Sequence, residues 1–328
     1  MSVAAFIVVA FMLTAYVILD GYDLGVASIT PLVAKNDPER ASTMHAIGPF
    51  WNGNEVWLIA AGGALFALFP QAYASSFSGF YLPFMIVLWL LMFRGIALEL
   101  RSHFPSEIWH TFWDACFAVA SALLILIFGV ALGNLVRGLP LDSKGFFQGT
   151  FTFLLNPYAL LVGLFAVVTL AQHGAAFLIL RLDGRPAERA RTMRPRLLIA
   201  TFVLFVAVTV ATYVMRSPAQ AAWIDILPIF GLLTLVWTWY ESRRGSDLRA
   251  FLSSSLFIAV LLVTAAATMY PYLLPSYPAG GGLSIFEASP SPVALTSALA
   301  VTIVGICAVA IYGSLVWRQL AGKVRVGE

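Results

Sequence analysis

Six charged side chains lie inside otherwise apolar stretches of the sequence. They are Asp20, Asp23, Glu55, Arg94, Glu99 and Asp114. A charged group near the centre of a bilayer costs about 2.5–3.5 kcal/mol on insertion scales, so each one requires a partner or a water-filled cavity. Acids that follow one another through a membrane can pass protons or cations along. We therefore expect a proton or cation path, with Asp20, Asp23, Glu55 and Asp114 as candidates.

The neighbours of these acids fit such a path. Asp20 and Asp23 are three residues apart and share a helix face, and Gly21 and Gly25 allow another helix to approach closely. Polar and aromatic residues surround Glu55, namely Trp51, Asn52, Asn54 and Trp57. We expect Asn52 to belong to the path, and Trp51 and Trp57 to have structural or partner-facing roles.

A purely structural interpretation also exists for each charged residue. Arg94 can neutralise one or two of the acids in buried ion pairs that hold helices together. Glu99 and Asp114 lie near predicted helix ends, where water can solvate a carboxylate. For these two residues the solvated interpretation is favoured, and Arg94 and Glu99 are predicted to be structural or partner-facing.

His173 lies within an apolar segment, where it could be a haem ligand or a hydrogen-bonded core residue. The core interpretation is favoured, because the sequence has no pair of histidines on one helix face. The sequence contains no phosphate-binding loop, nucleophile elbow or metal motif, and its two cysteines are too few for a cysteine-cluster metal site. No catalytic residue is predicted.

The amino-acid composition indicates a membrane protein. Of 328 residues, 60% are hydrophobic and only 11% are charged, with a mean hydropathy of +0.89. The net charge of +3 gives no reason to expect nucleic-acid binding, because the basic residues lie in short loops. We expect an all-α membrane protein in which residues 1–328 form a single transmembrane domain.

Nine spans of about 20 apolar residues can be drawn along the chain. They are Ala4 to Pro31, Phe50 to Phe69, Phe77 to Leu98, Trp113 to Leu135, Tyr158 to Leu180, Leu197 to Met215, Trp223 to Tyr240, Phe251 to Tyr270 and Val293 to Trp317. The segments 137–156 and 271–292 are the long loops, and the second, rich in glycine and proline, is expected to be irregular.

Lysines and arginines are distributed unequally between the two sides of these spans. Fifteen lie in alternate loops and the C-terminal tail, and three lie in the other loops. Positive charge accumulates on the cytoplasmic side, so the N-terminus is predicted outside and the C-terminus in the cytoplasm. Much of the signal comes from the stretch 181–196, for which an anionic-lipid patch is a second interpretation.

Several ordered strings resemble the cytochrome bd quinol oxidase subunit II family. They are LDGYDLGV, GPFWNGNEVWLIAAGGALFALFPQAYASSFSGFYLP, FRGIALELR, FGVALGNLVRG, LLNPYALLVG, MYPYLLPS and FEASPSPVALTSAL. The resemblance covers essentially the whole chain in order. It implies nine helices as two four-helix bundles plus one peripheral helix, in the bacterial inner membrane.

The resemblance also implies partners and cofactors. Such a subunit pairs with subunit I, which ligates haems b and d, and the complex oxidises quinol and reduces oxygen to water with protons from the cytoplasm. This subunit would support the assembly and stability of subunit I and help deliver protons, without ligating haem itself. A bound quinone and small single-helix accessory subunits are left open.

Three positions depart from the family pattern. Asn52 stands where many relatives have an aspartate proposed to lie on a proton path, and Glu55 stands where many have glutamine. Because these positions are three residues apart on one helix face, the resemblance makes Glu55 the nearest replacement. Similarly, Glu287 stands where many relatives have aspartate.

Two other functions fit the intramembrane acids. An ion-coupled secondary transporter would carry its charges near the midplane in two corresponding halves. Here the charges gather in the first four predicted spans, and the last four carry almost none except Asp225. The asymmetry favours a subunit whose polar face meets one partner. A purely structural subunit without a proton role is the third possibility.

Overall fold

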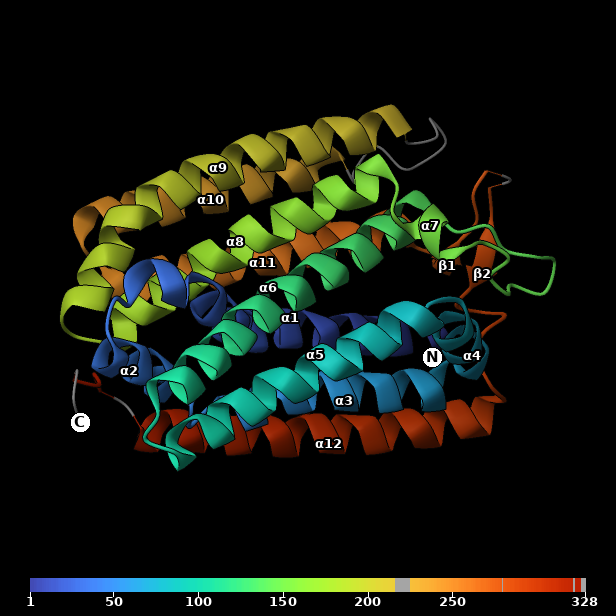
Figure 1. Cartoon of the computed structure of the whole chain (residues 1–328). Coiled ribbons are helices and arrows are strands. Elements are labelled where there is room, and N and C mark those ends of the chain that lie inside the picture. The colour runs from blue at the N-terminus through green and yellow to red at the C-terminus, as the bar shows by residue number, and fades with distance from the viewer. Residues whose placement is uncertain (216–224, 279, 321, 326–328) are drawn as a thin grey trace.

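The computed structural model describes residues 1–215, 225–278, 280–320 and 322–325, which are almost entirely helical (Figure 1). The long helices are α1 (Ser2–Val33), α3 (Trp51–Leu68), α5 (Tyr81–Leu100), α6 (Glu107–Arg137), α8 (Pro157–Arg181), α9 (Arg185–Met215), α10 (Leu227–Arg244), α11 (Asp247–Met269) and α12 (Pro292–Gln319). The short elements are α2 (Asp37–Ile47), α4 (Pro70–Gly79), η1 (Arg101–His103), α7 (Phe151–Leu154), β1 (Tyr272–Pro275) and β2 (Gly282–Ser284).

Length and hydropathy identify membrane helices among the long elements. Seven helices of the described chain are long and apolar enough to cross a bilayer, and the seven are α1, α5, α6, α8, α9, α11 and α12. In Figure 1, α3 and α10, of 18 residues each, run alongside these seven helices. The protein is therefore an all-α membrane protein, as the sequence predicts.

The two ends of the bundle are built differently. One end holds α2 and the C-terminal end of α12, and we call it the α2 end (Figure 1). The opposite end holds α4, α7 and the antiparallel pair β1 and β2, in which Tyr272 lies opposite Ser284 and Pro275 opposite Gly282. We call it the β end.

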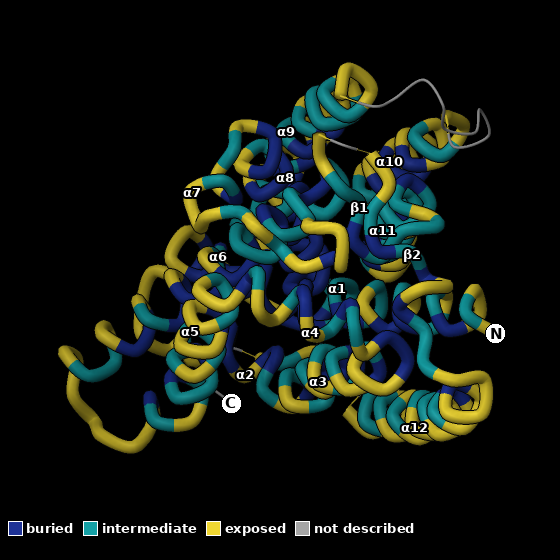
Figure 2. Tube along the Cα trace, turned by 90° about the vertical axis from the view of Figure 1, so that its right-hand side faces the viewer, coloured by how far each residue is buried: buried dark blue, intermediate teal, exposed yellow. Residues whose placement is uncertain are grey.

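Helix α1 occupies the centre of the molecule, where it contacts α3, α6 and α8 (Figure 2). Its closest crossing is with α8, where glycines face each other. A Cβ atom on Gly25 would lie 2.0 Å from the carbonyl oxygen of Leu170, and one on Gly174 would lie 2.3 Å from the carbonyl carbon of Gly25. Only glycine permits this approach, which brings the polar face of α1 into the core.

Three sequence predictions need correction. The basic stretch 181–196 is mostly helical, because α9 begins at Arg185, twelve residues before the expected span. The loop after the first span contains α2, whose first turn is capped by the Asn36 side chain accepting from the Glu39 N–H at 3.0 Å. The segment 271–292 contains the β1–β2 pair and is not irregular throughout. Trp223, the predicted start of the seventh span, lies outside the described residues.

Candidate functional site

A fully buried ion pair joins α5 to α1. Arg94 of α5 donates two hydrogen bonds to Asp20 of α1, from Nη1 to Oδ2 at 3.1 Å and from Nη2 to Oδ1 at 2.5 Å. The Arg94 Nη2 atom also lies 3.9 Å from Oδ2 of Asp23. All three residues are 0% exposed. We call these three residues, together with Asn54, the core cluster.

Asn54 connects α3 to this cluster. Its Nδ2 atom lies 2.7 Å from Asp23 Oδ2, 2.7 Å from the hydroxyl oxygen of Tyr22 and 3.3 Å from the Leu19 carbonyl oxygen. The Asp23 Oδ1 and Arg94 Nε atoms are buried without a hydrogen-bond partner among the described residues. The cluster is thus only partly satisfied by protein atoms.

The charges of the core cluster do not balance. Asp20 and Asp23 supply two carboxylates, and Arg94 supplies one guanidinium. An excess negative charge in a low-dielectric interior is costly, so the cluster favours the uptake of one positive charge. Arg94 makes two hydrogen bonds to Asp20, whereas its contact with Asp23 is longer, at 3.9 Å.

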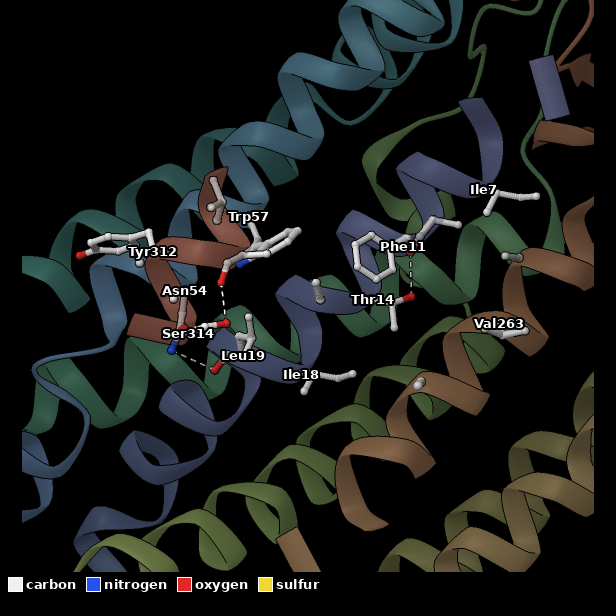
Figure 3. A pocket seen from close by; sticks show the side chains of 18 of the residues that line it. Ile7, Phe11, Thr14, Ile18, Leu19, Asn54, Trp57, Val263, Tyr312 and Ser314 are labelled. Atoms are coloured by element: carbon white, nitrogen blue, oxygen red, sulfur yellow. Dashed lines mark hydrogen bonds between the residues drawn. The ribbon is translucent and has the colours of Figure 1, made fainter. Parts of the chain in front are cut away.

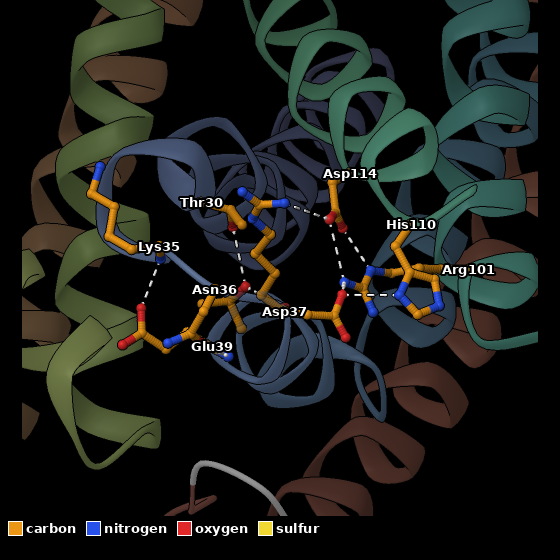
Figure 4. Close-up of polar contacts among 10 residues, drawn as sticks. Thr30, Lys35, Asn36, Asp37, Glu39, Arg101, His110 and Asp114 are labelled. Carbon is orange, nitrogen blue, oxygen red and sulfur yellow. Dashed lines mark hydrogen bonds and ion pairs between the residues drawn. The ribbon is translucent and has the colours of Figure 1, made fainter. Parts of the chain in front are cut away.

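A second group of charges lies at the α2 end, shown in Figure 4. Arg101 donates from Nε to Asp114 Oδ1 at 2.6 Å and from Nη2 to Asp37 Oδ1 at 2.5 Å. Arg40 Nη1 lies 3.4 Å from Asp114 Oδ2, and His110 Nδ1 lies 3.0 Å from Asp37 Oδ1. We call these five residues the α2-end cluster, which joins α2 to η1 and α6.

Exposure falls along the α2-end cluster. The Asp37 side chain is 53% exposed, that of His110 20% and that of Asp114 10%. Burial would raise the pKa of Asp37, but the hydrogen bond and positive charge of Arg101, together with His110, lower this pKa below its ordinary value. Asp37 is therefore ionised at neutral pH, and the cluster leads from the surface toward the interior.

His173 is a core residue with both ring nitrogens occupied. Its Nε2 lies 3.1 Å from the Ile18 carbonyl oxygen, and its Nδ1 lies 2.9 Å from the Ser254 hydroxyl. A carbonyl only accepts, so Nε2 carries a hydrogen. Its ring stacks on Phe251, with the centroids 4.9 Å apart. His173 therefore fits the hydrogen-bonded core interpretation and does not fit a haem ligand.

An apolar groove of about 1020 Å³ lies between α1, α3, α11 and α12 (Figure 3). Its lining runs from Phe11 and Trp57 to Tyr312 and Trp317, and Asn54 is one of its few polar residues. Trp57 is 6% exposed, and its ring meets that of Phe11 edge to face. The groove thus reaches the α3 side of the core cluster through Asn54.

Comparison with known proteins agrees with these features. The family model of cytochrome bd terminal oxidase subunit II matches residues 1–320 of the chain. The chain belongs to this family. It is therefore a subunit of a respiratory quinol oxidase and a multi-pass protein of the bacterial inner membrane.

Individual relatives support the assignment. The chain is 30% identical to cytochrome bd-I ubiquinol oxidase subunit 2 of Escherichia coli, with 97% of this chain and 93% of the relative covered. It is 37% identical to cytochrome bd ubiquinol oxidase subunit 2 of Bacillus subtilis over 62% of this chain and 60% of the relative. Its fold matches the bd oxidase structure from Geobacillus thermodenitrificans with a TM-score of 0.80, 19% identity and 98% coverage of both chains.

The remaining residues predicted from the sequence lie on α3 and α5. Asn52 is exposed, and Glu55 is half-buried without a hydrogen bond or ion pair in the described chain. Trp51 is half-buried near Gly95 of α5. Glu99 is exposed, which agrees with a solvated helix end. The structure thus places Asp20, Asp23 and Arg94 together but leaves Asn52 and Glu55 on the adjoining face of α3.

One interpretation of a charged residue was wrong. Asp114 is 8% exposed and paired with Arg101 and Arg40, so it is not a solvated helix end. Arg94, in contrast, is buried in contact with Asp20 and Asp23, as its structural interpretation expects. Sequence reasoning also missed Arg101, although it follows Arg94 by seven residues and so lies on the same face two turns along.

Proposed function

We propose that this chain is the subunit II that supports a haem-bearing subunit I and conducts protons toward it from the cytoplasm. The core cluster carries the proposal, because it contains two buried carboxylates with one guanidinium. Fully buried acids in a membrane are costly and are retained where charge must move. Asp23 would hold the transferred proton, Asp20 and Arg94 would fix its position, and Asn54 would orient its Oδ2 atom.

The α2-end cluster would supply the uptake mouth of this path. Asp37 and His110 are the accessible groups, and Asp114 lies behind them in contact with Arg101. Glu55, half-buried on α3, and the exposed Asn52 would lie on the side where the chain meets subunit I. A polar face on a membrane helix requires a polar partner, which supports that placement.

We further propose nine membrane spans in one transmembrane domain, as two four-helix bundles and one peripheral helix. The parallel course of α3 and α10 beside the seven apolar helices supports nine (Figure 1). Nine spans place the termini on opposite sides. The concentration of lysines and arginines in the loops of the α2 end supports a cytoplasmic location for this end, with the N-terminus outside.

The haems of the complex would be ligated by subunit I alone. Both nitrogens of His173 are engaged with this chain, so the buried histidine does not fit an iron ligand. Haem would supply the electron transfer and oxygen chemistry of the complex. The apolar groove fits the isoprenoid tail of a bound quinone, which extraction and mass spectrometry of the purified complex would detect.

The test begins with affinity purification of the chain with its native subunits. The expected result is a second large membrane subunit and the visible bands of haems b and d. Oxidase turnover of the Glu55→Gln complex would follow, with a severalfold decrease expected if Glu55 contributes a proton step. A colourless single-subunit protein that transports an ion-coupled solute would contradict the proposal and favour the secondary transporter.

A further inference from the structure

Polar residues recur at a spacing of seven on three neighbouring helices. The pairs are Asp23 and Thr30 on α1, Arg94 and Arg101 on α5 and η1, and Asp114 and Ser121 on α6. Seven residues are about two helical turns, or roughly 10.5 Å, and bring the second side chain back to nearly the same face. The three helices therefore carry two polar levels, one at the α2 end and one deeper.

The deeper level includes Ser121. Helices α5 and α6 run in opposite directions and are joined by the contact between Arg101 and Asp114. Arg94 and Ser121 each lie seven residues from that contact, on the side away from the α2 end. Ser121 therefore lies at the level of Arg94 and Asp23, on the face of α6 that Asp114 shares.

Three polar atoms at this level lack partners in the described chain. They are Ser121 Oγ, Arg94 Nε and Asp23 Oδ1, all with essentially no exposure. Buried polar groups almost always have a hydrogen-bond partner, and an ordered water usually supplies it where the protein does not. Nε–H only donates, an ionised carboxylate only accepts, and a hydroxyl does both. A water molecule satisfies all three requirements at once.

We propose that Asp23, Arg94 and Ser121 form a buried water site between α1, α5 and α6, and that this water relays protons from the α2-end cluster to Asp23. The inference rests on the proposed proton path and adds Ser121 to it as a positioning residue. A metal cation is disfavoured at this site, because the Arg94 guanidinium would repel it.

The interval between the two levels explains why a bound water would matter. Ala27, Ala97 and Phe117 lie between the levels on the three helices, and each is 0% exposed. None of these three side chains can carry a proton. Protons arriving at Asp114 therefore need water to reach the core cluster, and Ser121 would hold the water nearest to Asp23.

The first test is an experimental structure of the native complex at a resolution that orders internal water. We expect density within hydrogen-bond distance, about 2.7–3.2 Å, of both Ser121 Oγ and Asp23 Oδ1. An empty space between these atoms, or direct contacts that satisfy all three, would overturn the inference whatever the turnover of any variant.

The second test measures oxidase turnover and proton uptake of the Ser121→Val complex, which fills the site with methyl groups. We expect a decrease of about fivefold or more, because the relay loses a hydrogen-bonded link. Ser121→Ala, which leaves room for a second water, should retain more activity and covers the case in which the valine variant fails to assemble. Ser253→Ala is the matched control, because its buried hydroxyl bonds within its own helix to the Ala250 carbonyl at 3.1 Å.

The Asp23→Asn complex separates this inference from the function on which it rests. If Asp23→Asn slows proton uptake and neither Ser121 variant does, the water relay is wrong and the proton path stands. If Asp23→Asn turns over as the unmodified complex does, the proton path itself is wrong. Slow proton uptake in Asp23→Asn and Ser121→Val, with normal uptake in Ser253→Ala, supports both the proton path and the water relay.

Discussion

Helices α1 and α12 are nearly equal in hydropathy but opposite in their packing. Their most apolar windows have mean hydropathies of 2.5 and 2.4. Yet α1 buries fifteen residues, Asp20 and Asp23 among them, whereas α12 buries only Leu295 and Leu299. In Figure 2, α1 lies at the centre and α12 at the edge of the bundle. Hydropathy thus identifies a membrane helix without saying whether it faces lipid or protein.

The residues that distinguish these helices are glycines and charges. Gly25 of α1 lies against the backbone of α8, whereas nothing approaches within 4 Å of a Cβ placed on Gly305 of α12. Asp20 and Asp23 have partners on two other helices, whereas α12 carries only Arg318, exposed near its end. Small and charged residues placed on one face therefore mark the central helix.

The largest expected effect follows from removing the guanidinium of α5 that pairs with Asp20 of α1. Arg94→Met leaves Asp20 buried without its partner, and breaking a buried pair in this way costs about 3–5 kcal/mol. The purified complex should unfold at a clearly lower temperature or fail to assemble. Arg318→Met on α12 is the control and should change little. Equal thermal stability of the two variants would contradict the contrast between the helices.

A smaller effect is expected from a methyl group at the closest helix crossing. Gly25→Ala places a Cβ against the Leu170 carbonyl and forces α1 and α8 apart, at a cost of about 1–3 kcal/mol. Gly305→Ala meets no neighbour and should stay within about 0.5 kcal/mol of the unmodified protein. Thermal unfolding of both complexes in detergent measures the difference. A Gly305→Ala variant that is the less stable of the two would refute the placement of α12 at the edge of the bundle.

The smallest expected effect concerns the hydrogen bonds that hold the C-terminal ends of α1 and α12. Arg189 donates to Glu39 Oε2 at 2.6 Å and to the Val33 carbonyl at the end of α1 at 2.7 Å. Arg181 fastens the end of α12 through carbonyls alone, those of Leu320 at 2.7 Å and of Gly322. The Arg181 contacts contain no carboxylate, and the ion pair of Lys323 with Asp183 in the tail after α12 is exposed, whereas Glu39 is a buried carboxylate.

Burial would raise the pKa of Glu39, but the hydrogen bonds from Arg189 and the Lys35 N–H lower it below its ordinary value of 4.5. A lowered pKa contributes stability that is present above the ordinary pKa and is lost as the pH falls through the folded-state pKa. Hydrogen exchange should therefore show α2 and the end of α1 loosening below about pH 4.5, while the end of α12 stays protected. Glu39→Gln should abolish this pH dependence. Loosening of both helix ends together would show that the Glu39 fastening is not its cause.

Much of the fold was predictable from the sequence because lipid imposes a simple pattern. Apolar runs of about 20 residues identified the long helices, and the resemblance identified the family. The early start of α9 was missed because its first residues, which include Arg185 and Arg189, are polar and helical outside the apolar run. Helix α2 was missed because it is short and mostly polar. Its sequence signals are the Asn36 cap and Pro38 near its start.

The site was predictable in its residue types but not in its pairing. The cost of charge in lipid singled out Asp20, Asp23 and Arg94, and these residues are in contact. The residue types alone could not favour Asn54 over Asn52, because both are asparagines on the same helix. Only the rotation of α3 places Asn54 against Asp23 and leaves Asn52 exposed. Side-chain pairing across helices depends on such rotations, which apolar patterns leave undetermined.

The most direct measurement is the rate of proton uptake from the cytoplasmic side when the reduced complex reacts with oxygen. In the Asp23→Asn complex this rate should fall at least about tenfold, with subunit assembly and haem spectrum unchanged, because the core cluster can no longer accept the proton. Uptake at the unmodified rate in a fully assembled Asp23→Asn complex would contradict a proton path through this subunit and leave the core cluster as a purely structural feature.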